Sequence, residues 1–163
     1  MKSKARTVAI AAIFASIYAT VSLTLAPISF MAIQCRLADA LYPLIGLFGW
    51  PAIIGITIGE FITNTVSPLG PIDLLSPLVL LPAKWLIKRF GFKAVPVFAA
   101  SVGLWVAFML SVMFSQPYWI TMIYVTIGEV IASLGFGGLL YAALVRRLGW
   151  FQPHGVLDNN VAA

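Results

Sequence analysis

The sequence predicts an all-α integral membrane protein that folds as a bundle of six transmembrane helices. Of its 163 residues, 61% are hydrophobic and 9% are charged, and the mean hydropathy is +1.02. A soluble domain carries roughly 25% charged residues, so this composition is typical of a chain that crosses a membrane several times. We expect residues 1–148 to form one six-helix transmembrane domain and residues 149–163 to form a short C-terminal tail.

Prolines, glycines and basic residues divide the apolar sequence into six stretches. The first stretch ends at Pro27, whose ring disfavours a helical residue before it. Its apolar part is longer than the ~7–15 residues of a signal-peptide core, so we expect this first helix to be retained. The third stretch ends before a turn over residues 67–71, which holds two prolines and a glycine. The predicted helices cover residues 5–26, 36–48, 51–66, 72–90, 95–114 and 117–148.

The basic residues indicate how these helices are oriented. With six helices, both termini lie on one side of the membrane, and nine of the ten basic residues fall on that side. The positive-inside rule makes that side cytoplasmic, so we expect a multi-pass protein of the cell membrane with both termini in the cytoplasm. Topology, and not binding to nucleic acid, then explains the net charge of +5. The nine residues are Lys2, Lys4, Arg6, Lys84, Lys88, Arg89, Lys93, Arg146 and Arg147.

Five charged residues interrupt the apolar helices. An ionised side chain costs at least ~2.5 kcal/mol at the centre of a bilayer, so such residues usually face an interior cavity and serve a function. Glu129 lies about 15 Å into the sixth helix, near the middle of the membrane, and Glu60 reaches a similar depth from the opposite side. Arg36, Asp39 and Asp73 lie at the outer ends of their helices. The sequence therefore predicts a small-molecule pocket that opens outward.

Structural interpretations stay open for the same residues. Arg36 and Asp39 could pair with each other, because they lie three positions apart on one helix face. Asp73 follows a Gly-Pro turn at a helix start, where an aspartate often caps free backbone N–H groups. The neutral polar residues on the faces of the two glutamates could form hydrogen bonds between helices. These neutral residues are Thr57, Asn64, Thr126 and Ser133.

Small residues repeat every four positions along the first predicted helix. They form two neighbouring rows, which would let another helix approach closely. The rows could pack inside the bundle or dock to a partner membrane protein. The first row is Ala11, Ala15 and Ala19, and the second begins with Ala12 and Ser16.

Motifs of several enzyme classes do not occur in the sequence. It has no GxxxxGK[ST] phosphate loop, and no HExxH, GxSxG or paired-cysteine metal motif. Cys35 is the only cysteine, which leaves no disulfide within the chain and no cysteine metal cluster. We expect no enzyme activity, no catalytic residues, no cofactor and no metal.

Three strings of the sequence form a recognisable set. The first is Gln34-Cys35-Arg36-Leu37-Ala38-Asp39-Ala40-Leu41. The second is Ile58-Gly59, then Asn64, then Ser67-Pro68-Leu69-Gly70-Pro71-Ile72-Asp73. The third is Ile127-Gly128-Glu129-Val130, followed by Leu134-Gly135. Together they resemble one family of membrane proteins, the QueT family, over most of the chain. Glu60 stands where that family's pattern has a neutral residue, and Ser76-Pro77 replaces an expected Phe-Gly.

The resemblance implies a substrate-binding (S) component of an energy-coupling factor (ECF) transporter, with the six-helix fold of that class. The implied substrate is a queuosine precursor, a 7-deazaguanine base in its 7-cyano or aminomethyl form. The implied partners are membrane lipid, a transmembrane coupling subunit and two ATPase subunits. In S components a small-residue face of the first helix docks to the coupling subunit, which here falls on Ala11, Ala15 and Ala19 or on Ala12 and Ser16.

A guanine-like ring presents two adjacent N–H donors that match the two oxygens of one carboxylate. Our hypothesis gives this contact to Glu129. Gln34 or Arg36 would donate a hydrogen bond to the ring carbonyl, and Asn64 or Asp73 would contact the 7-substituent. Asp39 and Glu60 complete the set of substrate-binding residues that we expect.

Three other functions stay open on the sequence. One is an S component for another vitamin, such as riboflavin, thiamine or folate. The second is a proton-coupled carrier in which Glu60 and Glu129 form the relay. The third is a membrane enzyme that uses the acidic residues as general acid and base.

Overall fold

In a computed structural model the structure describes residues 2–25 and 36–148, and all regular secondary structure within these residues is helical. Elements η1, η2 and η3 are 3-10 helices and η4 is a π-helix. The chain begins with α1 (Lys2–Thr24), η1 (Leu37–Leu44), α3 (Ile45–Phe48) and α4 (Trp50–Asn64). It continues with η2 (Gly70–Leu75), α5 (Ser76–Val79), α6 (Leu81–Phe90), η3 (Gly91–Ala94) and α7 (Val95–Phe114). The last elements are α8 (Tyr118–Glu129), η4 (Val130–Phe136) and α9 (Gly137–Leu148).

The helical ranges predicted from the sequence fall on these elements within the described residues. Three of the predicted helices change type or break along their length, namely those over 36–48, 72–90 and 117–148. Three segments are long and apolar enough to cross a membrane: Lys4–Thr24, Gly70–Phe114 and Tyr118–Arg147. The tail predicted for residues 149–163 lies outside the described residues.

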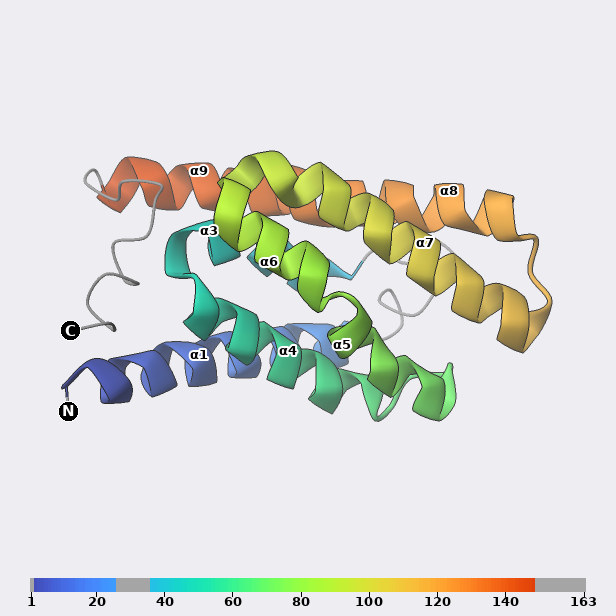
Figure 1. Ribbon diagram of the computed structural model, residues 1–163, viewed down its shortest axis with the longest axis horizontal. Coiled ribbons are helices and arrows are strands. Elements are labelled where there is room, and N and C mark those ends of the chain that lie inside the picture. Colours follow the sequence, from blue (N-terminus) through green and yellow to red (C-terminus); the bar gives the residue numbers. More distant parts are fainter. Residues whose placement is uncertain (1, 26–35, 149–163) are drawn as a thin grey trace.

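The elements pack as an elongated helical bundle, in which α1 lies beside α4 and α7 lies beside α8 (Figure 1). Small residues bring α1 and α4 close together. A Cβ atom added to Gly55 would lie 2.3 Å from the Ala11 carbonyl oxygen, and one added to Gly59 would lie 2.8 Å from Tyr18 Cβ. Only glycine fits at such distances.

The same contact decides between the two rows of small residues on α1. Ala11, Ala15 and Ala19 are buried inside the chain, whereas Ala12 and Ser16 are exposed. The first row therefore packs within the bundle and is not available to a partner. Any docking through small residues of α1 falls on the second row.

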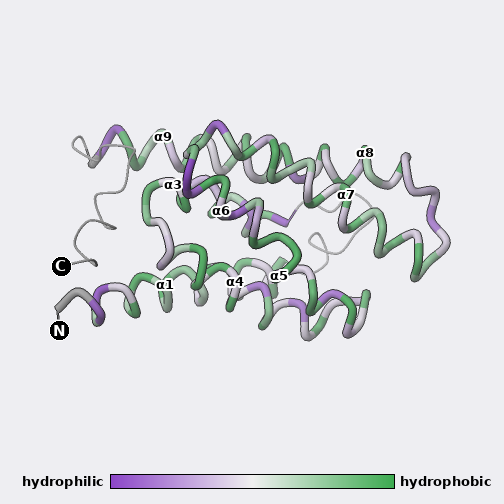
Figure 2. The backbone as a smooth tube through the Cα atoms, in the orientation of Figure 1, coloured by the Kyte–Doolittle hydropathy of each residue, from purple (hydrophilic) through white to green (hydrophobic). Residues whose placement is uncertain are grey.

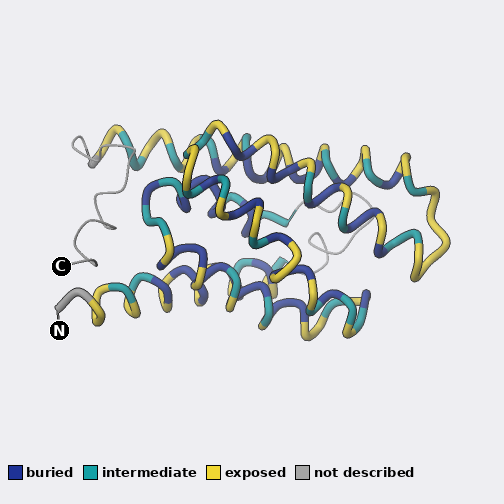
Figure 3. Tube along the Cα trace, in the orientation of Figure 1, coloured by how far each residue is buried: buried dark blue, intermediate teal, exposed yellow. Residues whose placement is uncertain are grey.

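The surface of the bundle is largely apolar, and its interior combines an apolar core with a buried group of polar side chains. Many large apolar residues of α4, α7 and α8 are exposed, and exposed positions recur along these helices in Figure 3. Most charged side chains outside the interior lie toward one end of the molecule, which holds the start of α1, the α6–α7 corner and the end of α9 (Figure 2). The cytoplasmic location of this end stays a prediction from the basic residues.

Lys84 is an exception, and its assignment to a cytoplasmic connection is wrong. Its side chain is 0% exposed and lies in the middle of α6, on the buried face of that helix with Ala83 and Ile87. The positive-inside argument therefore rests on the other eight basic residues of that group.

Candidate functional site

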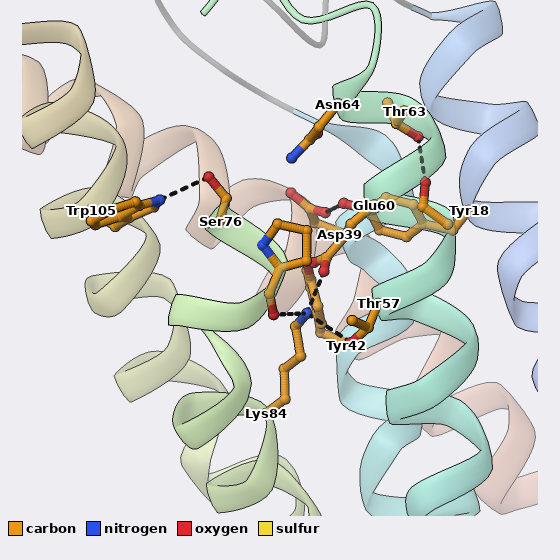
Figure 4. Close-up of polar contacts among 12 residues, drawn as sticks. Tyr18, Asp39, Tyr42, Thr57, Glu60, Thr63, Asn64, Ser76, Lys84 and Trp105 are labelled. Atoms are coloured by element: carbon orange, nitrogen blue, oxygen red, sulfur yellow. Dashed lines mark hydrogen bonds and ion pairs between the residues drawn. The ribbon is translucent and has the colours of Figure 1, made fainter. Parts of the chain in front are cut away.

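Polar side chains from several elements meet inside the bundle and form what we call the polar cluster (Figure 4). The other faces of these helices carry mainly apolar residues. A polar side chain on them therefore finds polar partners only within this cluster. The cluster comprises Tyr18, Arg36, Asp39, Tyr42, Thr57, Glu60, Asn64, Asp73, Ser76, Lys84, Trp105 and Glu129.

Tyr18 of α1 links two residues at the start of η1. Its hydroxyl donates to Asp39 Oδ1 at 2.6 Å and accepts from Arg36 Nη1 at 3.4 Å. The same guanidinium nitrogen of Arg36 donates to Asn64 Oδ1 at 3.3 Å. The predicted pair of Arg36 and Asp39 is therefore joined through a tyrosine, and Arg36 also ties the start of η1 to the end of α4.

Asp73 lies in the 3-10 helix η2 and does not cap a helix. Its Oδ1 accepts from Ser76 Oγ at 2.6 Å, and its backbone carbonyl accepts from Asn64 Nδ2 at 2.9 Å. Ser76 Oγ in turn accepts from Trp105 Nε1 at 2.8 Å, which ties α5 to α7. Asp73 Oδ2 is buried and has no hydrogen-bond partner.

Glu60 of α4 forms a buried ion pair with Lys84 of α6. The other oxygen of Glu60 accepts from the Tyr42 hydroxyl. Lys84 Nζ also donates to Thr57 Oγ1 at 3.2 Å and to the Pro77 carbonyl at 3.3 Å, so each of its three donors has an acceptor. Both charges are thus compensated by groups of the protein itself.

Glu129 is the last residue of α8 and is 2% exposed. Its buried carboxyl group lies near that of Asp39, and its Oε1 atom has no hydrogen-bond partner. The π-helix η4 follows at once, and there Ser133 Oγ donates to the Glu129 carbonyl oxygen at 2.7 Å. π-Helical turns within α-helices are frequent at functional sites.

The structure thus brings six of the seven predicted substrate-binding residues into one cluster, and the seventh, Gln34, lies outside the described residues. Thr126 packs elsewhere, because its Oγ1 atom lies 1.9 Å from where a Cβ of Gly103 on α7 would be. The sequence analysis did not assign five members of the cluster to the site. They are Tyr18, Tyr42, Ser76, Lys84 and Trp105.

A signal for Lys84 was present in the sequence. A glutamate at the depth of Glu60 needs a partner in an apolar medium, and Lys84 shares a helix face with apolar Ile87. The tyrosines and Trp105 carried no comparable signal, because aromatic residues are common throughout an apolar chain.

Within the described part of the chain, no group of three or more His, Cys, Asp or Glu residues could hold a metal ion.

A family model described as the QueT transporter matches residues 8–146. The chain belongs to the QueT transporter family. It is therefore a membrane transporter that binds a small-molecule substrate, and not an enzyme. No curated protein and no solved structure is similar enough to the chain to match it.

Proposed function

We propose that this QueT transporter is the S component of an ECF-type importer and that its substrate is a 7-deazaguanine precursor of queuosine. One observation supports a nitrogen-rich ligand above all. Glu129 Oε1 and Asp73 Oδ2 are buried acceptors without donors. Buried polar atoms in folded proteins are nearly always paired, and an exception needs an explanation. A ligand with several N–H donors would supply the missing partners.

The base edge and the 7-substituent can be assigned to these two acceptors. Glu129 would accept from N1–H and the exocyclic amine, which are adjacent donors on a guanine-like ring. Asp73 Oδ2 would accept from the 7-substituent. Arg36, which spans from Tyr18 to Asn64, would donate to the ring carbonyl.

The charge of the polar cluster favours the aminomethyl base over the 7-cyano base. Four carboxyl groups and two cations meet there, so the ionised cluster carries an excess of negative charge. A ligand with a positively charged amine would reduce this excess, whereas the uncharged cyano group would not. The cluster contains the cations Arg36 and Lys84 and the carboxyl groups of Asp39, Glu60, Asp73 and Glu129.

The same proposal includes the topology and the partners. The chain would cross the cell membrane six times with both termini in the cytoplasm, since the described basic residues outside the polar cluster belong to the start of α1, the α6–α7 corner and the end of α9. A transmembrane coupling subunit with two ATPase subunits would power transport. Its docking site would be the exposed row of Ala12 and Ser16 on α1, because Ala11, Ala15 and Ala19 are buried against α4.

Calorimetric titration of the purified protein with 7-aminomethyl- and 7-cyano-7-deazaguanine tests the ligand. We expect the aminomethyl base to bind more tightly. Glu129→Gln should lower its affinity about 100-fold, because truncating one side of a buried charged contact typically costs about 2–5 kcal/mol. Thr121→Val is the control on the same helix, since Thr121 Oγ1 donates to the Pro117 carbonyl and not to a member of the polar cluster.

Wild-type affinity in Glu129→Gln would remove this residue from the site. Tight binding of riboflavin, thiamine or folate in place of either base would keep the S-component proposal and change its substrate. Uptake into liposomes by the chain alone under a pH gradient would instead favour a proton-coupled carrier.

A further inference from the structure

The α6–α7 corner holds a cavity that no member of the polar cluster lines. Its volume is about 650 Å³, and its lining joins this corner to Tyr141 of α9. Two of its lining residues are the cations Arg89 and Lys93, and three are the aromatic residues Phe90, Phe92 and Tyr141. The cavity thus combines positive charge with apolar surface.

The chain builds this cavity with a sharp corner and an aromatic wall. Helix α6 ends at Gly91, whose φ of +64° is a backbone conformation that favours glycine. The turn directs Phe92 toward α9, where its ring lies 5.3 Å from the Tyr141 ring, centroid to centroid. A Cβ atom on Gly138 would lie 3.2 Å from the Phe92 ring. Phe92 is therefore wedged against α9, which fixes one wall of the cavity.

No carboxylate balances the two cations within the described residues. The four acidic residues described all lie in the polar cluster, and none lines the cavity. The Arg89 guanidinium lies over the rings of Trp85 and Phe90, at 5.9 Å and 5.8 Å from their centroids. These cation–π contacts hold the guanidinium group in place. Its N–H groups can still donate hydrogen bonds to an anion in the cavity.

The surroundings of the cavity fit lipid. Phe90 is 55% exposed and Val97 is 51% exposed, and both line the cavity. In a membrane protein such exposed apolar side chains contact acyl chains. The corner also belongs to the end of the molecule that carries the other basic residues (Figure 2). Basic pockets between transmembrane helices on that side are typical sites for anionic lipid headgroups.

We propose that this cavity binds the phosphate headgroup of an anionic phospholipid. Arg89 and Lys93 bind the phosphate, and the acyl chains run along Phe90 and Val97. The bound lipid bridges the α6–α7 corner and α9, so it stabilises the packing of Phe92 on Tyr141.

Native mass spectrometry of the full chain in detergent tests this site, with phosphatidylglycerol and phosphatidylcholine of identical acyl chains as probes. We expect the wild type to prefer phosphatidylglycerol. The double variant R89Q/K93Q should reduce phosphatidylglycerol affinity about 30-fold, because each cation near an anionic lipid contributes about 1 kcal/mol. Binding of phosphatidylcholine should not change.

The matched control is R146Q/R147Q, which removes the same charge from the exposed end of α9, outside the cavity. It should keep the wild-type preference. An equal loss in both double variants would show general attraction to a basic surface and overturn the proposal. Displacement of the lipid by millimolar inorganic phosphate would overturn it too, because it would make a free anion the ligand.

Discussion

The pair of Glu60 and Lys84 offers the sharpest test of how the bundle holds charge in its interior. Replacing Lys84 by methionine leaves Glu60 buried with only the Tyr42 hydroxyl as donor. Breaking a buried pair by removing one partner costs about 3–5 kcal/mol, because the remaining charge is uncompensated. We expect Lys84→Met and Glu60→Gln each to lower the free energy of unfolding by about this amount.

The double variant K84M/E60Q should be more stable than either single variant. It contains neither charge, and the amide oxygen that Glu60→Gln introduces could still accept from Tyr42. The remaining cost is about 1–3 kcal/mol for acceptors that Lys84 no longer reaches, chiefly the Pro77 carbonyl. The coupling energy between the two positions is then at least about 3 kcal/mol.

Reversible unfolding in mixed micelles, followed by tryptophan fluorescence, measures all four species. Lys88→Met is the control for removing a lysine from α6. Lys88 lies one turn further along the helix, with its ammonium 5.4 Å from the centroid of the Trp50 ring, and its loss should cost about 1 kcal/mol or less. Two single effects that add to within about 0.5 kcal/mol would refute the ion pair as described.

Three further substitutions test single contacts by the same unfolding assay or by titration with the aminomethyl base. Gly103→Ala should lower stability by about 1–3 kcal/mol, because its Cβ would lie 1.9 Å from Thr126 Oγ1; Gly135→Ala, with nothing within 4 Å, should have little effect. Tyr18→Phe should cost about 1–3 kcal/mol, since it leaves Asp39 Oδ1 without its donor at 2.6 Å. Trp105→Phe should weaken binding about fivefold by freeing Ser76 from one of its partners, and unchanged affinity would show that the indole does not support Asp73.

The helical segments could be read from the sequence because apolar length and helix breakers mark them directly. Helix α4 begins at Trp50, within one residue of the start expected at Pro51, and α6 is capped by Gly91 where the basic cluster predicted a connection. The 3-10 helices and the π-helix could not be read in this way. They depend on contacts between distant segments, such as Asn64 with the Asp73 carbonyl.

The acidic members of the polar cluster were also predictable, because a charge in an apolar segment needs a reason. Lys84 was misread because it stands four residues from Lys88 and five from Arg89, in a run that resembles a topology signal. Position on the helix separates them: Lys84 is buried and Arg89 is exposed. Only the packing of α6 against α4 reveals which lysine faces inward.

The π-helix η4 determines how the two ends of the last long helix are turned relative to each other. Glu129 precedes it and points to the polar cluster, while Tyr141 follows it and packs on Phe92. Deleting one residue within Val130–Phe136 would restore an ordinary helical repeat and rotate everything after it by about 100°. The polar cluster would keep Glu129, but Tyr141 would leave the α6–α7 corner. Length in this short segment is therefore under a tighter constraint than the identity of most residues in it.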